Sequence, residues 1–139
     1  MIPKECKRLA EVDFPIAKVS SYAVLEKAGP KGHPSTLHLW WARRPLAACR
    51  AVLLAAIIPD PCDQNCPVTF KNLSREILKH LPYSLGKSDL DLRNGLLSFI
   101  GDFSNWDLGS NGIYIEAARS LVKISFNKDA PFIVDSFAV

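Results

Sequence analysis

The sequence lacks any apolar run long enough to cross a membrane. Residues 51–58 form an uncharged apolar run of eight residues, whereas a membrane-spanning helix needs about 20. The first twenty residues contain Lys, Glu and Asp side chains where a secretory signal would have an apolar segment. We therefore expect a cytoplasmic protein that makes no contact with a membrane.

Cysteine is also scarce, and its spacing argues against a metal site. The four cysteines are Cys6, Cys49, Cys62 and Cys66. A structural zinc site needs four ligands, and no second cysteine pair at comparable spacing follows the CDQNC segment at residues 62–66. His80 is the one downstream candidate ligand. We expect no metal site, and a zinc ion at Cys62 and Cys66 remains the less favoured interpretation.

Charge is unevenly distributed along the chain, although the net charge of +3 is too small to indicate a polyanionic partner. Residues 1–50 carry nine basic and four acidic side chains, whereas residues 51–139 carry eight and ten. An anionic ligand is therefore expected near the N-terminal third. A solvated basic face would give the same pattern.

Hydrophobic periodicity and helix-boundary residues predict a mainly α fold. The expected helices span residues 15–28, 45–58, 72–81, 89–103 and 111–126, with an irregular link at 59–67. The helix at 45–58 has no charged side chain on either face except Arg50. It is therefore expected to be buried all round.

Residues 131–139 differ in character from the helices before them. They form a short apolar burst without helical period, in which Asp135 is followed by small residues. This is typical of a buried parallel strand that places an acid at its carboxyl end. Because a lone strand is not stable, it must pair either with residues 9–14 or with a sheet beyond Val139, and we favour the second. The expected domains are a helical one at 1–130 and the first strand of a truncated α/β domain at 131–139.

Three segments together resemble a known family. RLAEVDFPIAKVS, GHPSTLHLWWARRPLAACRAVLLAAIIPDP and FIVDSFAV are similar to the N-terminal region of large adenine-specific DNA methyltransferases. Such proteins carry a zinc ribbon further on and occur in restriction or anti-phage gene neighbourhoods, and their opening domain is one of unknown function. The resemblance covers residues 8–60 closely and residues 131–138 briefly.

The resemblance implies a site for S-adenosylmethionine. The stretch at 33–36 and the Arg-Pro-Leu at 44–46 resemble the cofactor motif, and residues 135–138 resemble the end of the first Rossmann-like strand. Two residues depart from that strand's pattern, since Ser136 stands in place of proline and Val139 in place of glycine. The cofactor-binding residues implied are Ser35, Thr36, Trp40, Pro45, Asp135 and Phe137.

The chemistry of the cofactor explains these residue types. The helix start at Pro45 offers backbone N–H groups to the methionine carboxylate, and the hydroxyl groups of Ser35 or Thr36 add donors. Asp135 can hold the ammonium group. Trp40 or its neighbour Trp41 can face the sulfonium, although burial statistics favour a core role over a ligand role for each tryptophan.

The arginines of this region have different expected partners. Arg43 and Arg44 precede the helix and either contact DNA phosphate or remain solvated. Arg50 lies on an apolar helix face, where an unpaired charge is costly. Asp135 is its first expected partner and DNA phosphate the second. His33 and His38 have no diagnostic partner.

Two features that adenine methylation requires are absent from the sequence. No Asn/Asp-Pro-Pro-Tyr/Phe tetrapeptide is present to hold a flipped base, and no glycine-rich loop follows the expected strand. We therefore expect an N-terminal part of a methyltransferase that has no catalytic residues of its own. It would need a downstream catalytic domain or subunit to bind S-adenosylmethionine and methylate DNA. The alternative is a non-catalytic helical interaction module or accessory subunit of a defence complex.

Overall fold

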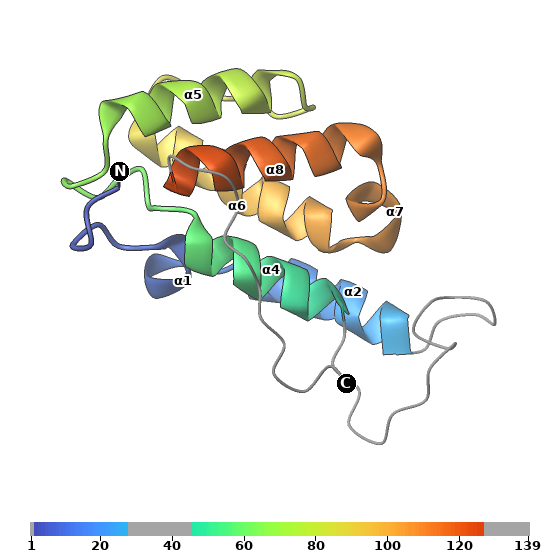
Figure 1. The fold of residues 1–139 in the computed structure, drawn as a ribbon. Helices are drawn as coiled ribbons and strands as arrows, with labels where there is room; N and C mark the ends of the chain where they lie inside the picture. Colours follow the sequence, from blue (N-terminus) through green and yellow to red (C-terminus); the bar gives the residue numbers. More distant parts are fainter. Residues whose placement is uncertain (1, 28–45, 127–139) are drawn as a thin grey trace, which may run out of the picture.

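The computed structural model describes residues 2–27 and 46–126, which form a bundle of α-helices (Figure 1). The described part of the chain contains no strand, so the expected mainly α fold is confirmed there. The helices are α1 (Leu9–Val12), α2 (Ile16–Lys27), α4 (Leu46–Ile57), α5 (Val68–Lys79), α6 (Asp89–Ser104), α7 (Trp106–Gly109) and α8 (Gly112–Phe126).

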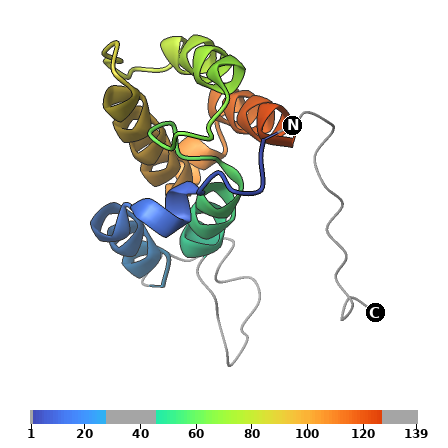
Figure 2. The same cartoon turned by 90° about the vertical axis from the view of Figure 1, so that its left-hand side faces the viewer.

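Helix α6 is the centre of the bundle. It contacts α2, α4, α5 and α7. Figure 2 shows α2 (blue) and α4 (green) lying side by side, and α8 packs against both α4 and α5. The core fills the space between these helices, and its most deeply buried members include Leu92, Leu96, Phe99 and Ile100 of α6.

The start of α6 shows why its boundaries were predictable. The Ser88 side chain accepts a hydrogen bond from the backbone N–H of Asp91 at 3.0 Å, and Asp91 accepts one from the Ser88 N–H at 3.2 Å. Such a reciprocal pair satisfies two donors that the first helical turn leaves free. The predicted helices at 89–103 and 111–126 are confirmed as α6 and α8.

Helix α5 begins earlier than expected. The sequence predicted a helix start near residues 72–74, but α5 begins at Val68, directly after Pro67. The proline fixes its own φ at −62°, which suits a helix entry. One turn further, Phe70 is 2% exposed and anchors the added turn in the core. Ser74 lies inside the helix and is fully buried.

The single-turn helices α1 and α7 were not predicted. Helix α1 overturns the suggestion that residues 9–14 form an extended partner for a strand, because Leu9–Val12 is helical. The side chain of Glu11 accepts a hydrogen bond from the Arg8 N–H at 2.9 Å and closes this turn. A turn of four residues has too few positions to show a helical period.

The irregular link at 59–67 is confirmed, and it is held firmly in place. An antiparallel bridge joins Arg8 to Pro59, with hydrogen bonds from Leu9 N–H to Ile58 O at 3.0 Å and from Asp60 N–H to Lys7 O at 2.8 Å. The guanidinium of Arg8 also donates to Ile57 O at 3.1 Å. The end of α4 is thereby capped by the beginning of the chain.

A buried ion pair connects the link to α6. Arg93 donates from Nε and Nη2 to the two carboxylate oxygens of Asp60 at 2.8 and 2.6 Å. The Asp60 carboxylate also accepts from the N–H of Cys62 at 3.0 Å. The hydrogen bond to the Asp60 carboxylate raises the pKa of Arg93 above its ordinary value, so the guanidinium stays charged at neutral pH.

The expectation that α4 is buried all round is wrong. Its inner side, with Ala51 and Ala55 fully buried, packs in the core, and the small side chains let neighbouring helices approach closely. On the outer side, Leu46, Val52 and Leu53 are 41, 53 and 54% exposed. An uncharged helix face was taken as evidence of burial, and here it faces outward.

The expected strand at 131–139 and the domain boundary before it lie outside the described residues. Within the described residues, no helix has the length and apolar character that a membrane span requires.

Candidate functional site

All residues that the sequence predicted to bind cofactor or DNA lie outside the described residues. They are Ser35, Thr36, Trp40, Arg43, Arg44, Pro45, Asp135 and Phe137. The structure does describe the helix that follows most of them, α4, and the side chains that surround its first turns. These surroundings form the candidate site.

Glu26 of α2 occupies the amino end of α4. Its Oε2 atom accepts a hydrogen bond from the backbone N–H of Ala47 at 3.0 Å, and the residue is 6% exposed. A carboxylate here meets the positive end of the helix dipole and satisfies a donor that would otherwise be unpaired. The helix start was expected to offer its backbone N–H groups to a ligand, and for the N–H of Ala47 that expectation is wrong, because it donates to Glu26. Sequence reasoning missed Glu26 because it is 21 residues away along the chain.

Arg50 lies one turn further along α4, against aromatic rings. Its guanidinium carbon is 4.9 Å from the ring centroid of Trp106 and 5.9 Å from that of Phe103. Gly109 makes room for it, since a Cβ atom at that position would lie 2.7 Å from Arg50 Nη1. The cation is thus stabilised by two π faces, a partner that the sequence prediction did not consider.

The Arg50 guanidinium still has an unused hydrogen-bond donor. Nη1 is buried and has no hydrogen-bond partner among the described residues. A buried donor left unpaired costs about 1–3 kcal/mol. The expected pairing of Arg50 with Asp135 lies outside the described residues, so that prediction stays open.

The chemistry available around the start of α4 is binding rather than catalysis. Arg50 offers a cationic donor suited to a carboxylate or a phosphate, and Glu26 offers a buried carboxylate. Both side chains come from rigid helices, which favours precise positioning of a ligand or of a neighbouring segment.

The cysteines do not form a reactive centre. The buried thiols of Cys6 and Cys66 are in hydrogen-bond contact, and burial raises the pKa of Cys66 to about 12. Burial also raises the pKa values of Cys6 and Cys62. Protonated thiols are poor nucleophiles and poor metal ligands. Among the described residues, no three His, Cys, Asp or Glu side chains are grouped so that they could hold a metal ion.

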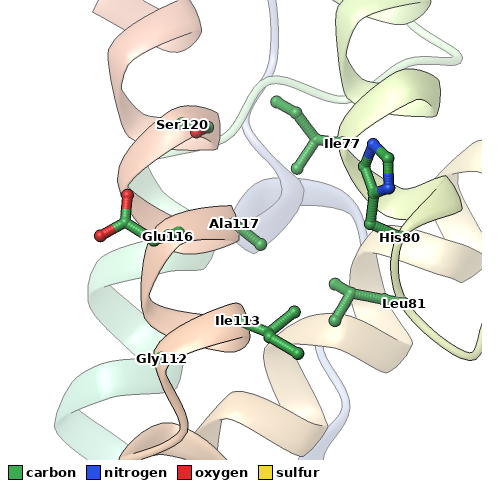
Figure 3. Close-up of a pocket in the computed structure, with 8 residues that line it drawn as sticks. All are labelled: Ile77, His80, Leu81, Gly112, Ile113, Glu116, Ala117 and Ser120. Atoms are coloured by element: carbon green, nitrogen blue, oxygen red, sulfur yellow. The ribbon is translucent and has the colours of Figure 1, made fainter.

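A separate open hollow of about 400 Å³ lies between the end of α5 and the start of α8 (Figure 3). Figure 3 shows Ile77 of α5, Leu81 of the turn that follows α5 and Ile113 of α8 pointing into it. The carboxylate of Glu116 points away from the imidazole of His80, so the two do not form an acid–base pair. The hollow is an apolar depression without catalytic chemistry.

Comparison with known proteins gives one match. Residues 13–81 match the model of a family described as a protein of unknown function (DUF1156). The matched segment contains α2, α4, the link and α5, and it includes the stretch at 33–46 on which the cofactor motif rests. The expectation of a domain of unknown function is confirmed for this segment. No curated protein and no solved structure matches the chain.

Proposed function

We propose that this chain, whose residues 13–81 match the family of proteins of unknown function DUF1156, is the N-terminal part of an adenine-specific DNA methyltransferase. The observation that carries the proposal is the way α4 is held. Glu26 fixes its first turn, and Arg50 fixes its second turn against Trp106 and Phe103. A rigid helix start gives the preceding cofactor-motif residues a firm base from which to bind a ligand.

The proposed ligand is S-adenosylmethionine. Ser35 and Thr36 supply hydroxyl donors for its carboxylate, together with the helix start at Pro45. The two hydroxyl groups supply most of the hydrogen bonds to the cofactor carboxylate, because the N–H of Ala47 already donates to Glu26. Asp135 holds the ammonium group, while Trp40 faces the sulfonium and Phe137 lines the pocket.

The proposed DNA-binding residues are Arg43 and Arg44. Both contact backbone phosphates, which makes DNA binding weaker at higher salt. The base-holding loop comes from a downstream domain or subunit, so the chain alone methylates nothing. A cytoplasmic restriction or anti-phage enzyme is the setting that the resemblance favours.

Calorimetric titration of S-adenosylmethionine tests the proposal. We expect little or no binding by residues 1–139 alone, and measurable binding when the chain is extended through the reading frame that follows it. In the extended protein, Trp40→Ala and Asp135→Asn should each weaken binding about tenfold. An extended protein that binds no cofactor, or that encodes no Pro-Pro-Tyr/Phe loop, would refute the assignment.

A helical interaction module is the second candidate, and the exposed apolar side of α4 favours it. Such a module would be stable and monodisperse by itself, and extension would change neither its stability nor its ligand binding. Light scattering and thermal unfolding of the two lengths of chain would separate the two candidates.

A further inference from the structure

Two buried cysteines that are far apart in the sequence lie against each other in the fold. Cys6 is 2% exposed and Cys66 is 5% exposed, and both are free thiols. The Cys66 thiol donates a hydrogen bond to the Cys6 sulfur, and the Cys6 thiol donates to the Lys7 carbonyl oxygen at 3.6 Å. The two sulfur atoms are therefore direct neighbours in the core.

Backbone hydrogen bonds fix the position of each cysteine. The Lys7 N–H donates to Oδ2 of Asp63 at 3.4 Å, and the Asp60 N–H donates to the Lys7 carbonyl at 2.8 Å. Within the link, the Cys66 N–H donates to the Asp63 carbonyl at 3.1 Å. The contact between the thiols is thus set by the backbone on both sides, and it does not depend on a flexible side chain.

We propose that Cys6 and Cys66 form a disulfide when the protein is exposed to a peroxide, and that this bond locks the N-terminal segment, residues 2–8, onto the link. One sulfur attacks a peroxide oxygen, which releases one water and leaves a sulfenic acid. The second sulfur then attacks the sulfenic sulfur, so that the S–S bond forms and a second water leaves. Two thiols are oxidised and one hydrogen peroxide is reduced to two waters. The inference goes beyond the proposed function and does not depend on it.

The arrangement of the pair suits such a bond. A disulfide places its sulfur atoms about 2 Å apart and its Cβ atoms about 3.5–4.5 Å apart. Thiols that are already in contact can reach this geometry by rotation about their Cα–Cβ bonds, while the backbone stays in place. The bond closes a loop of about 60 residues, which restricts the unfolded chain and should stabilise the fold.

Cys62 is closer to Cys66 in the sequence, but Cys6 is the better partner. Cys62 is only partly buried, and the charged groups of Arg93 and Asp60 act on its thiol. The thiol that acts on Cys66 is that of Cys6. A bond between Cys62 and Cys66 would also leave the N-terminal segment untied.

Burial controls how fast the pair reacts. It raises the pKa values of both thiols, and the thiolate is the reactive form. Oxidation should therefore be slow at neutral pH and faster in alkaline solution. The pair acts as a lock that closes under sustained oxidation, and a reducing compartment keeps it open.

Disulfide mapping by mass spectrometry tests the inference on the whole chain, residues 1–139. The protein is treated with hydrogen peroxide at about pH 9, unfolded, alkylated and then cleaved before aspartate residues, which places each of the four cysteines in a different peptide. We expect a bond between Cys6 and Cys66 that dithiothreitol reverses. The melting temperature of the oxidised protein should be about 10 °C higher than that of the reduced protein.

Three variants serve as controls. Cys6→Ala and Cys66→Ala should gain no thermal stability on oxidation, whereas Cys62→Ala should behave as the parent chain does. Circular dichroism checks that the two core variants fold, and the peptide map of the parent chain decides the question even if they do not.

The remaining outcomes would overturn the inference. They are a bond between Cys62 and Cys66, bonds between two chains, and Cys6 and Cys66 thiols that stay reduced or are oxidised singly. A melting temperature that falls when the bond forms would show that it strains the fold instead of locking it. Because neither cofactor nor DNA is present, these results leave the proposed methyltransferase function to the calorimetric titration.

Discussion

Asp60 and Arg93 form one ion pair, but replacing each of them should lower the free energy of unfolding by a different amount. The Asp60 side chain is 3% exposed and that of Arg93 is 20% exposed. If Arg93 is replaced, the carboxylate remains in the interior, and the Cys62 N–H is the one hydrogen-bond donor left to it among the described residues. If Asp60 is replaced, the long arginine side chain can turn its head toward water. We therefore expect Arg93→Ala to be the more damaging change.

The structure sets the size of these effects. Removing one partner of a buried pair costs about 3–5 kcal/mol, and we expect Arg93→Ala to lower the free energy of unfolding by that amount. For Asp60→Ala, the partial exposure of Arg93 reduces the cost to about 1–3 kcal/mol, mostly from the lost hydrogen bonds. A domain of this size has a total stability of about 5–15 kcal/mol, so Arg93→Ala should remove a large share of it.

Urea unfolding followed by far-UV circular dichroism measures both values at neutral pH. Arg119→Ala is the matched control, because Arg119 pairs with Glu116 at 2.8 Å while both side chains are at least 70% exposed. That pair should contribute less than about 1 kcal/mol. A cost for Arg93→Ala no greater than that of the control, or a larger cost for Asp60→Ala, would refute the argument from burial.

Three further predictions concern other parts of the bundle. Gly109→Ala should lower the melting temperature, with a cost of about 1–3 kcal/mol, because its Cβ would lie 2.6 Å from a backbone oxygen and 2.7 Å from a guanidinium nitrogen. Gly112→Ala, with no atom within 4 Å of its Cβ, should raise the melting temperature by the equivalent of about 0.5–1 kcal/mol. A melting temperature higher for Gly109→Ala than for Gly112→Ala would contradict the packing described. Glu26→Ala should cost about 1–2 kcal/mol in urea unfolding by leaving the Ala47 N–H unpaired, whereas Glu26→Gln, which keeps an acceptor, should cost less. Burial raises the pKa of Cys66 from 9.0 to about 12, so the neutral thiol contributes fully to the free energy of unfolding below about pH 9. Above that pH the free energy of unfolding should decline by about 1.4 kcal/mol per pH unit. Cys66→Ala should flatten this decline, and equal slopes in the two proteins would show that the thiol ionises freely in the fold.

The helices were predictable where local signals define them. The α6 boundaries follow from the Ser88 cap and from a clear apolar period, and those of α8 follow from a similar period. Helix α5 was placed too late because Pro67 was assigned to the link instead of the helix entry. Its true start depends on the burial of Phe70, which is a tertiary effect that no local pattern contains.

The surroundings of α4 were harder to predict, because they depend on contacts between distant residues. The need of Arg50 for a partner was evident from an isolated charge on an apolar helix. That its partners include the rings of Phe103 and Trp106 follows only from the way the end of α6 and α7 pack beside α4. Glu26 gave no signal at all, since a glutamate near the end of a helix is usually solvated.

The bridge between Arg8 and Pro59 also fixes an order of events on the ribosome. The Arg8 guanidinium and the Ile57 carbonyl that it caps are 49 residues apart in the chain. At synthesis rates of about 5–20 residues per second, their emergence is separated by about 2–10 s. During that interval the backbone groups of residues 7–9 remain hydrated, and they become protected only when residues 57–60 leave the exit tunnel.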